Sequence, residues 1–325
     1  MLNEPQLVTN HRTRQKEIVV QDVKNKLHLI SNTGQILWKK QLKGPILGKI
    51  EQIDMFKNGY LQMAFATPNE VHVIARNGKE VPPFPLKFND EITQPLSVFD
   101  YDKKRDYRLF VTQGKNVLLY DGKGKTVKGF EFSSAKTTIN HQPQHIRIGN
   151  KDYVIIKTND DINILTRRGK PRVSAKTKLN YDDQPVFNYN GTFVTATEAG
   201  KLATIDRNGN VTVSTLFGEN TNLLTTSKTL VAQNENKLKI KSNIVDLDFA
   251  TYSKPSLFYI RNKIYVSVTN LQSHKVLLYD SQGKSLPNFP VYGNSVIELN
   301  NIDRDSNLEF ITKGEANNIL IYELN

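Results

Sequence analysis

Short apolar runs recur along the whole chain, and many of them are followed by a polar turn that ends in glycine. The clearest two copies lie 90 residues apart and comprise Glu17–Val20, Lys26–Ile30 and Asn32–Gly34, then Arg108–Val111, Asn116–Tyr120 and Asp121–Gly124. In both copies a proline, Pro5 or Pro95, stands 29 residues before the last glycine. Apolar runs of this length between turn residues predict β-strands, and their regular recurrence predicts a repeat fold.

The turn glycines give the length of the repeat. The six that stand out are Gly34, Gly78, Gly124, Gly169, Gly209 and Gly283. The first five are spaced 44, 46, 45 and 40 residues apart. The last gap, 74 residues, leaves room for one degenerate unit, in which 237–243 is expected to form the third strand and its turn. A polar turn with Gly or Asn between two apolar runs favours a hairpin, because these residues accept a positive φ.

Each unit is expected to contain four strands. A proline precedes most first strands, where it removes no ladder hydrogen bond: Pro5, Pro95, Pro143, Pro185 and Pro255. The predicted first strands include 96–99, 185–189 and 256–260; the second 109–112, 153–157, 191–196 and 264–268; the third 117–121 and 276–280. Two fourth strands, 81–86 and 286–291, contain Phe-Pro and are predicted to be edge strands, since proline cannot donate to a ladder.

These features predict an all-β fold, an eight-bladed β-propeller of four-stranded antiparallel blades in a single domain over residues 1–325. A seven-bladed ring is the alternative. The last unit, with strands at 296–300, 308–312 and 319–322, lacks a fourth strand. Propellers usually close by building one blade from both chain ends, so we expect the closing strand to precede residue 1 and the chain to belong to a longer protein. The alternative is a ring that closes non-covalently with one three-stranded blade.

Composition narrows the class of protein. No segment has sustained helical periodicity, no apolar run approaches the length of a membrane span, and the start of the chain does not resemble a signal peptide. The chain contains no cysteine, which excludes disulfides, thiolate metal sites and a cysteine nucleophile.

The net charge of +12 is concentrated in three basic segments, 103–108, 115–128 and 167–178. One interpretation is a solvated rim that discourages edge-to-edge pairing of strands. The other is a surface for an anionic partner, such as nucleic acid, an acidic protein face or a charged membrane. Repeated aromatic residues that could stack on bases do not occur within these segments, which argues against nucleic acid.

One loop has the spacing of a calcium site. Oxygen-bearing side chains alternate along it at Asn301, Asp303, Asp305, Asn307 and Glu309. Ca²⁺ prefers six to eight oxygen ligands from a tight loop, so this loop predicts a Ca²⁺ site. The alternative is an Asx-rich turn without a metal, since the sixth position is serine and not glycine.

Catalytic chemistry has little support in the sequence. Two histidines, His141 and His145, would lie about 13 Å apart on an extended strand, too far to share a zinc ion. The inner strands offer only a scattered set of acids and one base: Glu51, Asp54, Asp100, Arg147 and Glu298. No nucleophile elbow, phosphate-binding loop or dinucleotide fingerprint is present. The sequence therefore predicts that the protein is not an enzyme and has no cofactor apart from Ca²⁺.

Two families of propeller resemble this chain. The segment Asn32–Lys39, with Thr33-Gly34 followed by Trp38, resembles the repeat of PQQ-like propellers, in which the tryptophan docks neighbouring blades. The Phe-Pro endings and the loop Asn301–Glu309 resemble FG-GAP (VCBS) propellers, which often bind calcium in such a loop. Trp38 is the only tryptophan, so the resemblance does not imply an active quinoprotein dehydrogenase.

These observations together predict a non-catalytic scaffold for protein–protein interaction in a bacterial envelope assembly. The partner would be another protein or the remainder of a longer chain. The alternative is a cation-dependent propeller that binds a ligand or glycan. Since the resembling families mostly work there, we expect a periplasmic or extracellular location.

Overall fold

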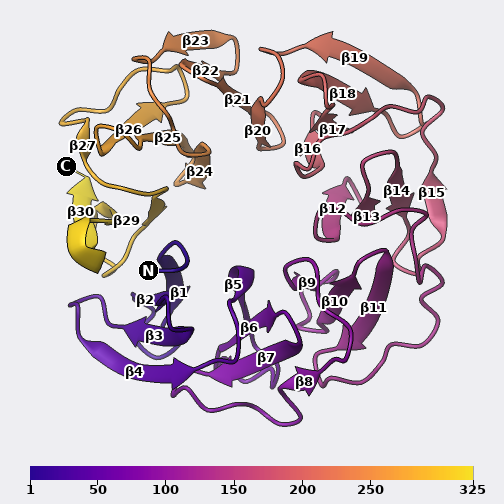
Figure 1. Cartoon of the computed structure of the whole chain (residues 1–325), viewed down its shortest axis with the longest axis horizontal. Helices are drawn as coiled ribbons and strands as arrows, with labels where there is room; N and C mark the ends of the chain where they lie inside the picture. Colours follow the sequence, from indigo (N-terminus) through magenta and orange to yellow (C-terminus); the bar gives the residue numbers. More distant parts are fainter. Residues whose placement is uncertain (325) are drawn as a thin grey trace.

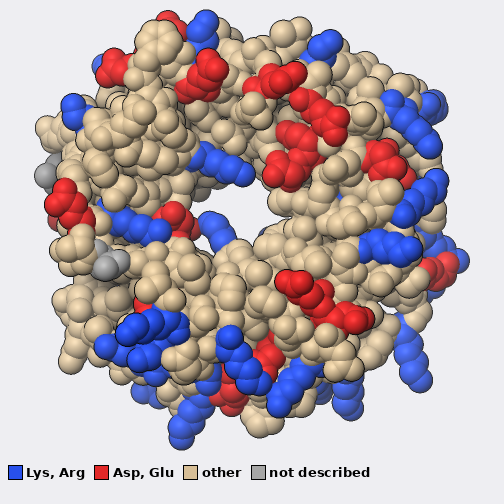
Figure 2. Space-filling view, viewed as in Figure 1, with Lys and Arg blue, Asp and Glu red and all other residues tan. Residues whose placement is uncertain are grey.

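A ring of eight antiparallel sheets makes up the fold, as the computed structural model of the chain shows (Figure 1), and the space-filling view shows an opening at its centre (Figure 2). The structure describes residues 1–324, and of Asn317 only the backbone. The predicted all-β, eight-bladed architecture is confirmed, including the degenerate sixth blade. The one helical segment among residues 1–324 is the short 3₁₀ turn η1 (Glu315–Asn317), so no described helix is long enough to cross a bilayer.

The strands occupy four radial positions, from the central opening outwards. The first strands are β1 (Gln6–Thr9), β5 (Leu47–Ile53), β9 (Ser97–Phe99), β12 (Gln144–Ile148), β16 (Phe187–Tyr189), β20 (Asn222–Thr225), β24 (Ser256–Ile260) and β28 (Glu298–Asn300). The second strands are β2 (Lys16–Gln21), β6 (Gln62–Thr67), β10 (Arg108–Gln113), β13 (Lys151–Lys157), β17 (Thr192–Ala196), β21 (Leu230–Asn234), β25 (Lys263–Asn270) and β29 (Leu308–Lys313). The third strands are β3 (Lys26–Ile30), β7 (Glu70–Ala75), β11 (Asn116–Asp121), β14 (Ile162–Leu165), β18 (Lys201–Ile205), β22 (Lys237–Ile240), β26 (Lys275–Asp280) and β30 (Ile319–Leu324). The fourth strands are β4 (Ile36–Gln41), β8 (Leu86–Lys87), β15 (Pro171–Val173), β19 (Val211–Thr215), β23 (Asn243–Asp246) and β27 (Val291–Tyr292).

Burial follows this radial order, because each sheet is covered on both faces by its neighbours. The second strand of blade 2, β6, is buried along its whole length, whereas the outer strand β4 of blade 1 alternates between exposed and half-buried positions. Between blades 2 and 3 the core joins Ala64 and Val73 of one sheet to Leu109 and Val111 of the next. In the part of the chain that the structure describes, the apolar contacts between sheets therefore hold the ring together.

The outer strands differ most from the prediction. In the predicted strands 81–86 and 286–291, the regular ladder is confined to the two-residue strands β8 and β27. Single backbone hydrogen bonds from Val81 N to Val73 O (2.8 Å) and from Leu286 N to Leu278 O (2.9 Å) lie before the Phe-Pro segments, which interrupt the pairing. In blade 3, isolated bridges from Tyr120 to Thr126 and from Asn116 to Ser134 take the place of a regular fourth strand. Proline and turn residues cannot sustain a continuous ladder in these segments.

Blade 8 contains three described strands, β28 to β30, as predicted, and it packs directly on blade 1. The contact buries Ile18 of blade 1 against Ile302 and Ile311 of blade 8. A backbone hydrogen bond from Lys16 N to Ile302 O (2.7 Å) reinforces it. Packing between blades 8 and 1 thus closes the ring within residues 1–324. A closing strand from outside these residues stays a prediction.

Candidate functional site

The loop between β28 and β29 brings three of the five predicted calcium ligands together. Carboxylate oxygens of Asp303, Asp305 and Glu309 all lie within 4.8 Å of one another. The two asparagines instead hold the loop in shape. Asn301 donates to the backbone carbonyls of Asp305 (2.7 Å) and Asn307 (3.0 Å), and Asn307 donates to the Glu323 carboxylate (2.5 Å). The loop is therefore a folded turn with three convergent acids.

Glu309 is the buried member of this cluster, with 6 % of its surface exposed. Its Oε2 accepts a hydrogen bond from the Ile302 N–H (2.5 Å), and its Oε1 is buried without a partner among the described residues. Burial raises the pKa of Glu309, and the charges of Asp303 and Asp305 raise it further, although the Ile302 N–H opposes them. An uncompensated buried carboxylate is unfavourable, so this position favours a bound cation.

Two other blades have a buried acid at the same point, the second residue of the second strand. In blade 1, Glu17 accepts hydrogen bonds from the Arg76 guanidinium of blade 2 (Nε to Oε2 2.9 Å). In blade 4, Asp152 accepts from Arg167 (2.8 Å) and bonds the His145 ring (2.7 Å). Burial opposes ionisation of Asp152, but these two partners outweigh it and lower its pKa. No described basic side chain forms an ion pair with Glu309, so blade 8 lacks the internal cation that blades 1 and 4 possess.

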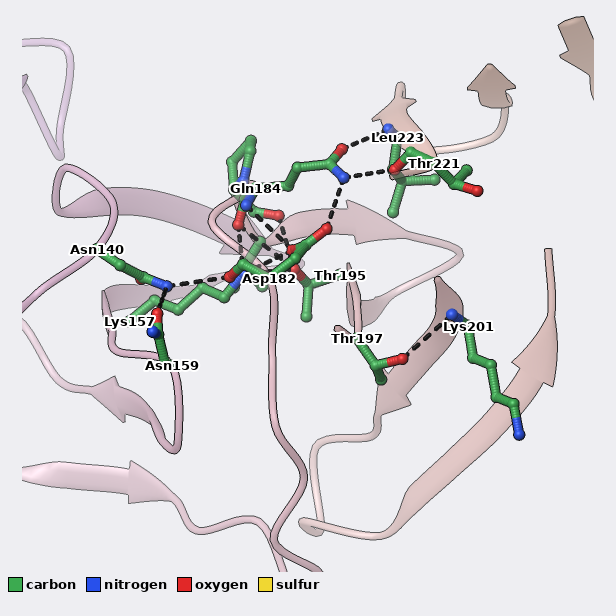
Figure 3. Close-up of polar contacts among 12 residues, drawn as sticks. Asn140, Lys157, Asn159, Asp182, Gln184, Thr195, Thr197, Lys201, Thr221 and Leu223 are labelled. Carbon is green, nitrogen blue, oxygen red and sulfur yellow. Dashed lines mark hydrogen bonds and ion pairs between the residues drawn. The ribbon is translucent and has the colours of Figure 1, made fainter. Parts of the chain in front are cut away.

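The most buried basic group joins blades 4 and 5 (Figure 3). Lys157, at the end of β13, donates to Asp182 Oδ1 (3.3 Å), to the Gln184 carbonyl and to Thr195 Oγ1 (3.0 Å). Burial lowers the pKa of Lys157, and the charge of Asp182 opposes this shift. An ammonium group has three hydrogens, and Lys157 has three acceptors. This lysine is therefore engaged between blades and has no hydrogen left for a substrate.

A cleft of about 750 Å³ lies beside this network and is lined by Asp160, Lys178, Asn180, Thr197, Lys201 and Val213 among others. The Lys201 side chain extends away from the Lys157 network, while its backbone N–H donates to Thr197 Oγ1 (3.1 Å) (Figure 3). Apart from the Lys201 ammonium, which has no dashed line in Figure 3, the polar groups shown there are engaged in turns and contacts between blades. They do not converge on one point of the cleft.

A repeated glutamine, which was not predicted from the sequence, links consecutive blades. Gln6 accepts a bond from Ile50 N (2.9 Å) and donates to Ile50 O (2.5 Å), and Gln144 does the same with Val186 N (2.8 Å) and O (2.9 Å). Related bonds come from Gln94 and Gln184. Each of these glutamines is adjacent to a proline that marks a first strand, so the Pro-Gln or Gln-Pro pair was the available signal.

The inner-strand acids and bases suggested as candidate catalytic groups do not form one site. Asp54 pairs with Arg105 (2.7 Å), and Glu298 pairs with Lys49 (2.7 Å). Arg147 donates to the Tyr101 carbonyl (2.9 Å). These contacts are spread over several blades, so they stabilise loops and strands of the ring.

The seam between blades 8 and 1 carries an apolar groove of about 500 Å³. Its apolar lining includes Ile18, Val20, Val23, Ile30 and Ile36 of blade 1 and Ile319 and Ile321 of β30. Val23 is 71 % exposed, Ile36 48 % and Ile321 40 %. Among the described residues, β30 pairs only with β29, so its other edge is open. The charged residues are not confined to one seam: on the face shown in Figure 2, Lys and Arg lie around the ring with Asp and Glu interspersed.

No protein-family model and no curated protein matches the chain. Solved structures share its fold. They include BamB from Moraxella catarrhalis (TM-score 0.62, 11 % identity, 98 % of this chain and 96 % of that one) and BBS1N in complex with ARL6DN (0.60, 14 %, 99 % and 91 %). A third is the dihydro-heme d1 dehydrogenase NirN in complex with DHE (0.64, 12 %, 100 % and 74 %). At these identities the similarity establishes an eight-bladed propeller and nothing about activity.

Proposed function

We propose that this propeller is a non-catalytic platform that binds a protein partner at the seam between blades 8 and 1, which we call the seam groove. One observation carries the proposal: the seam groove combines exposed apolar side chains with an open strand edge. A contiguous apolar surface beside an unpaired edge is typical of a protein-binding site. The BBS1N structure, which shares the fold, contains a protein partner and so supports this use of a propeller.

The buried and inner-strand charged groups are bonded to other groups of the ring, which favours a non-catalytic role. Lys157, Glu17 and Asp152 are each bonded to groups within or between blades, and Asp54 and Glu298 have ion-pair partners. A catalytic site requires acids or bases that face a common substrate position. Titratable side chains do line both places. In the seam groove His28 and Asp22 pair with each other (3.0 Å), and in the cleft beside the Lys157 network the Lys201 side chain extends away from that network.

Affinity capture with matched surface variants tests the platform. Ile321→Asp places a charge in the seam groove, whereas Ile244→Asp places one on the exposed outer strand of blade 6, where Ile244 is 55 % exposed. We expect a partner retained by the wild type and by Ile244→Asp to lose at least tenfold in yield with Ile321→Asp. Equal loss with both variants, or no loss with either, would contradict a binding site at the seam.

A second function is supported by Glu309, and we propose that the loop 301–309 binds Ca²⁺. Asp303, Asp305 and Glu309 supply convergent carboxylates, and the buried oxygen of Glu309 lacks a partner among residues 1–324. Calorimetric titration with Ca²⁺ should give heat that is lost in Asp303→Ala and Asp305→Ala. The absence of heat with the wild type would leave only an Asx-rich turn.

Separate experiments test the predicted glycan binding, the predicted location and the predicted role in an envelope assembly. A glycan or other ligand bound through Ca²⁺ would show calcium-dependent retention on a glycan array. Fractionation of the source cells would test the proposed periplasmic or extracellular location and a role in an envelope assembly. The PQQ-like and FG-GAP assignments stay resemblances.

A further inference from the structure

We infer that the partner occupies the seam groove as an extended strand, which pairs with the open edge of β30 and becomes the fourth strand of blade 8. This inference rests on the proposed protein-binding function and specifies its mode. The occupant is a segment of a second protein with an apolar or aromatic residue at its centre. A closing strand from a longer form of this chain, as the sequence predicts, would instead protect the β30 amides without any partner, and that result would overturn the inference.

The turn glycines of the other blades show what normally covers this position. A Cβ atom at Gly78 would lie 3.1 Å from the ring of Trp38 in β4, and one at Gly124 would lie 3.2 Å from Leu86 in β8. At Gly283 it would lie 2.9 Å from Val245 in β23. Each of these turns is therefore covered by the fourth strand of the preceding blade.

Two further turn glycines are covered in the same way. Gly169 lies against the outer segment of blade 3, with Phe130 at 3.1 Å, and Gly209 lies against Ser174, directly after β15. Gly34, the equivalent glycine of blade 1, has nothing within 4 Å of such an atom. The preceding blade is blade 8, which has no fourth strand among the described residues. Gly34 also lines the seam groove.

The side chains of β30 indicate the pattern of the missing neighbour. Tyr322 stacks on Phe310 (ring centroids 5.1 Å), and Tyr322 and Leu324 pack in the core shared with blade 7. Ile319 and Ile321 face the opposite way, into the seam groove. A strand paired with β30 would likewise place alternate residues towards blade 7 and towards blade 1.

The seam groove is the outward continuation of an interface that already exists. The buried contact between Ile18, Ile302 and Ile311 closes the ring, and Ile30 and Ile319 extend it to the groove. An added strand would lengthen this interface and pair the open N–H and C=O groups of β30. Strand addition to an open sheet edge obtains affinity from main-chain bonds and specificity from alternate side chains.

A peptide with the sequence of 35–42, which contains Trp38 of the chain's own outer strand, is a direct probe. We expect it to bind and to slow hydrogen exchange of the β30 amides at least tenfold. The same peptide with proline in place of Leu37 and Lys39 should not bind, because it cannot form the ladder. The natural strand need not match this sequence closely, so the free peptide could bind weakly. In a second version of the experiment the peptide is therefore joined to Met1, which lines the groove, through a Gly/Ser linker. The linker raises the effective concentration of the peptide at the groove to about 1 mM.

Two glycine variants of the protein test whether the peptide binds beside Gly34. Gly34→Asn keeps a residue that accepts positive φ and adds a side chain where the occupant would lie (φ +85°). Gly59→Asn is the matched control, since Gly59 also has φ +85° and open space, in a loop of blade 2. Gly34→Asn should weaken peptide binding at least tenfold, and Gly59→Asn should leave it unchanged.

The possible results distinguish strand addition to β30 from protein binding at the seam groove. Protection of β30 in the complex with the captured partner supports strand addition. Capture that depends on Ile321 without protection of β30 overturns the strand but not the platform. Loss of both, with neither free nor linked peptide bound, overturns both. A concentration-dependent dimer whose β30 amides are already protected would assign the edge to a second copy of this chain, and that result also overturns the inference.

Discussion

Replacing Glu309 with glutamine is expected to stabilise the protein at neutral pH in the absence of divalent cations. Only 6 % of the Glu309 surface is exposed, and one of its carboxylate oxygens has no partner among the described residues. A buried group left without a partner costs about 1–3 kcal/mol, and more when it is charged. Glutamine removes the charge, and its amide can donate to the nearby carboxylates of Asp303 or Asp305. We therefore expect a gain of about 1–2 kcal/mol in the free energy of unfolding.

The dependence on pH follows from the raised pKa of Glu309. Between its unfolded value of about 4.5 and its higher folded value, the folded state binds more protons, so stability falls as pH rises. The penalty is thus absent below about pH 4.5 and complete above the folded pKa. The difference between Glu309→Gln and the wild type should disappear in acid and be largest at neutral pH.

Calcium should reverse the order of stability. At a free concentration about 100-fold above Kd, binding to the folded state adds about 2.7 kcal/mol, or about 4 °C in Tm for a chain of this length. The wild type should gain this amount and Glu309→Gln should not. The matched control is Glu17→Gln, which removes the partner of Arg76 and should lower stability by about 2 kcal/mol with the calcium response retained.

Urea unfolding followed by the fluorescence of the single tryptophan, in EGTA and in Ca²⁺, measures all three proteins. A loss of stability in Glu309→Gln as large as in Glu17→Gln, in EGTA at neutral pH, would refute the reasoning. It would mean that Glu309 is already compensated within the fold.

Three further predictions concern contacts between blades, each measured by urea unfolding followed by far-UV circular dichroism, because one of the variants removes the single tryptophan. Gln144→Ala leaves the N–H and C=O of Val186 without their partner and should cost about 1–3 kcal/mol. Trp38→Ala removes the ring over the next blade's turn and the bond from Nε1 to a carbonyl (2.6 Å), and should cost about 3 kcal/mol. Lys157→Met leaves Asp182 without its cation and should cost about 3 kcal/mol, part of which Asp182→Asn should restore in the double variant.

The controls for these predictions come from exposed positions. Gln282→Ala, on the hairpin turn of blade 7, should change stability by less than about 0.5 kcal/mol. If Gln144→Ala were equally neutral, the repeated glutamine would not stabilise the ring. Strict additivity of Lys157→Met and Asp182→Asn would show that the two side chains are not coupled.

The repeat was predictable because its marks are local in the sequence. The glycine at 34 and its counterparts require a positive φ that few residues adopt, so their spacing reported the number of blades even across the degenerate sixth one. The short outer strands were less predictable. A Phe-Pro segment has the composition of a strand, but its pairing depends on whether the neighbouring third strand continues beside it.

The candidate site was predictable only in part. Spacing identified the loop 301–309, because the acids that converge there are close in sequence. It could not show that Asn301 would bond the loop's own carbonyls and Asn307 the Glu323 carboxylate. Nor could it show that Glu309 would lack an arginine, since Arg76 and Arg167 act across blades or across a sheet. The seam groove involves residues from both ends of the sequence and depends on the closed ring.

Photo-crosslinking from the seam in living cells tests the central claim most directly. A photoreactive phenylalanine analogue at Ile321 is compared with the same residue at Ile244, and both positions are exposed. The account predicts a discrete crosslinked protein from Ile321, absent at Ile244 and displaced by the 35–42 peptide. Equal crosslinking from both positions, or none from Ile321 while a partner is still captured, would contradict it.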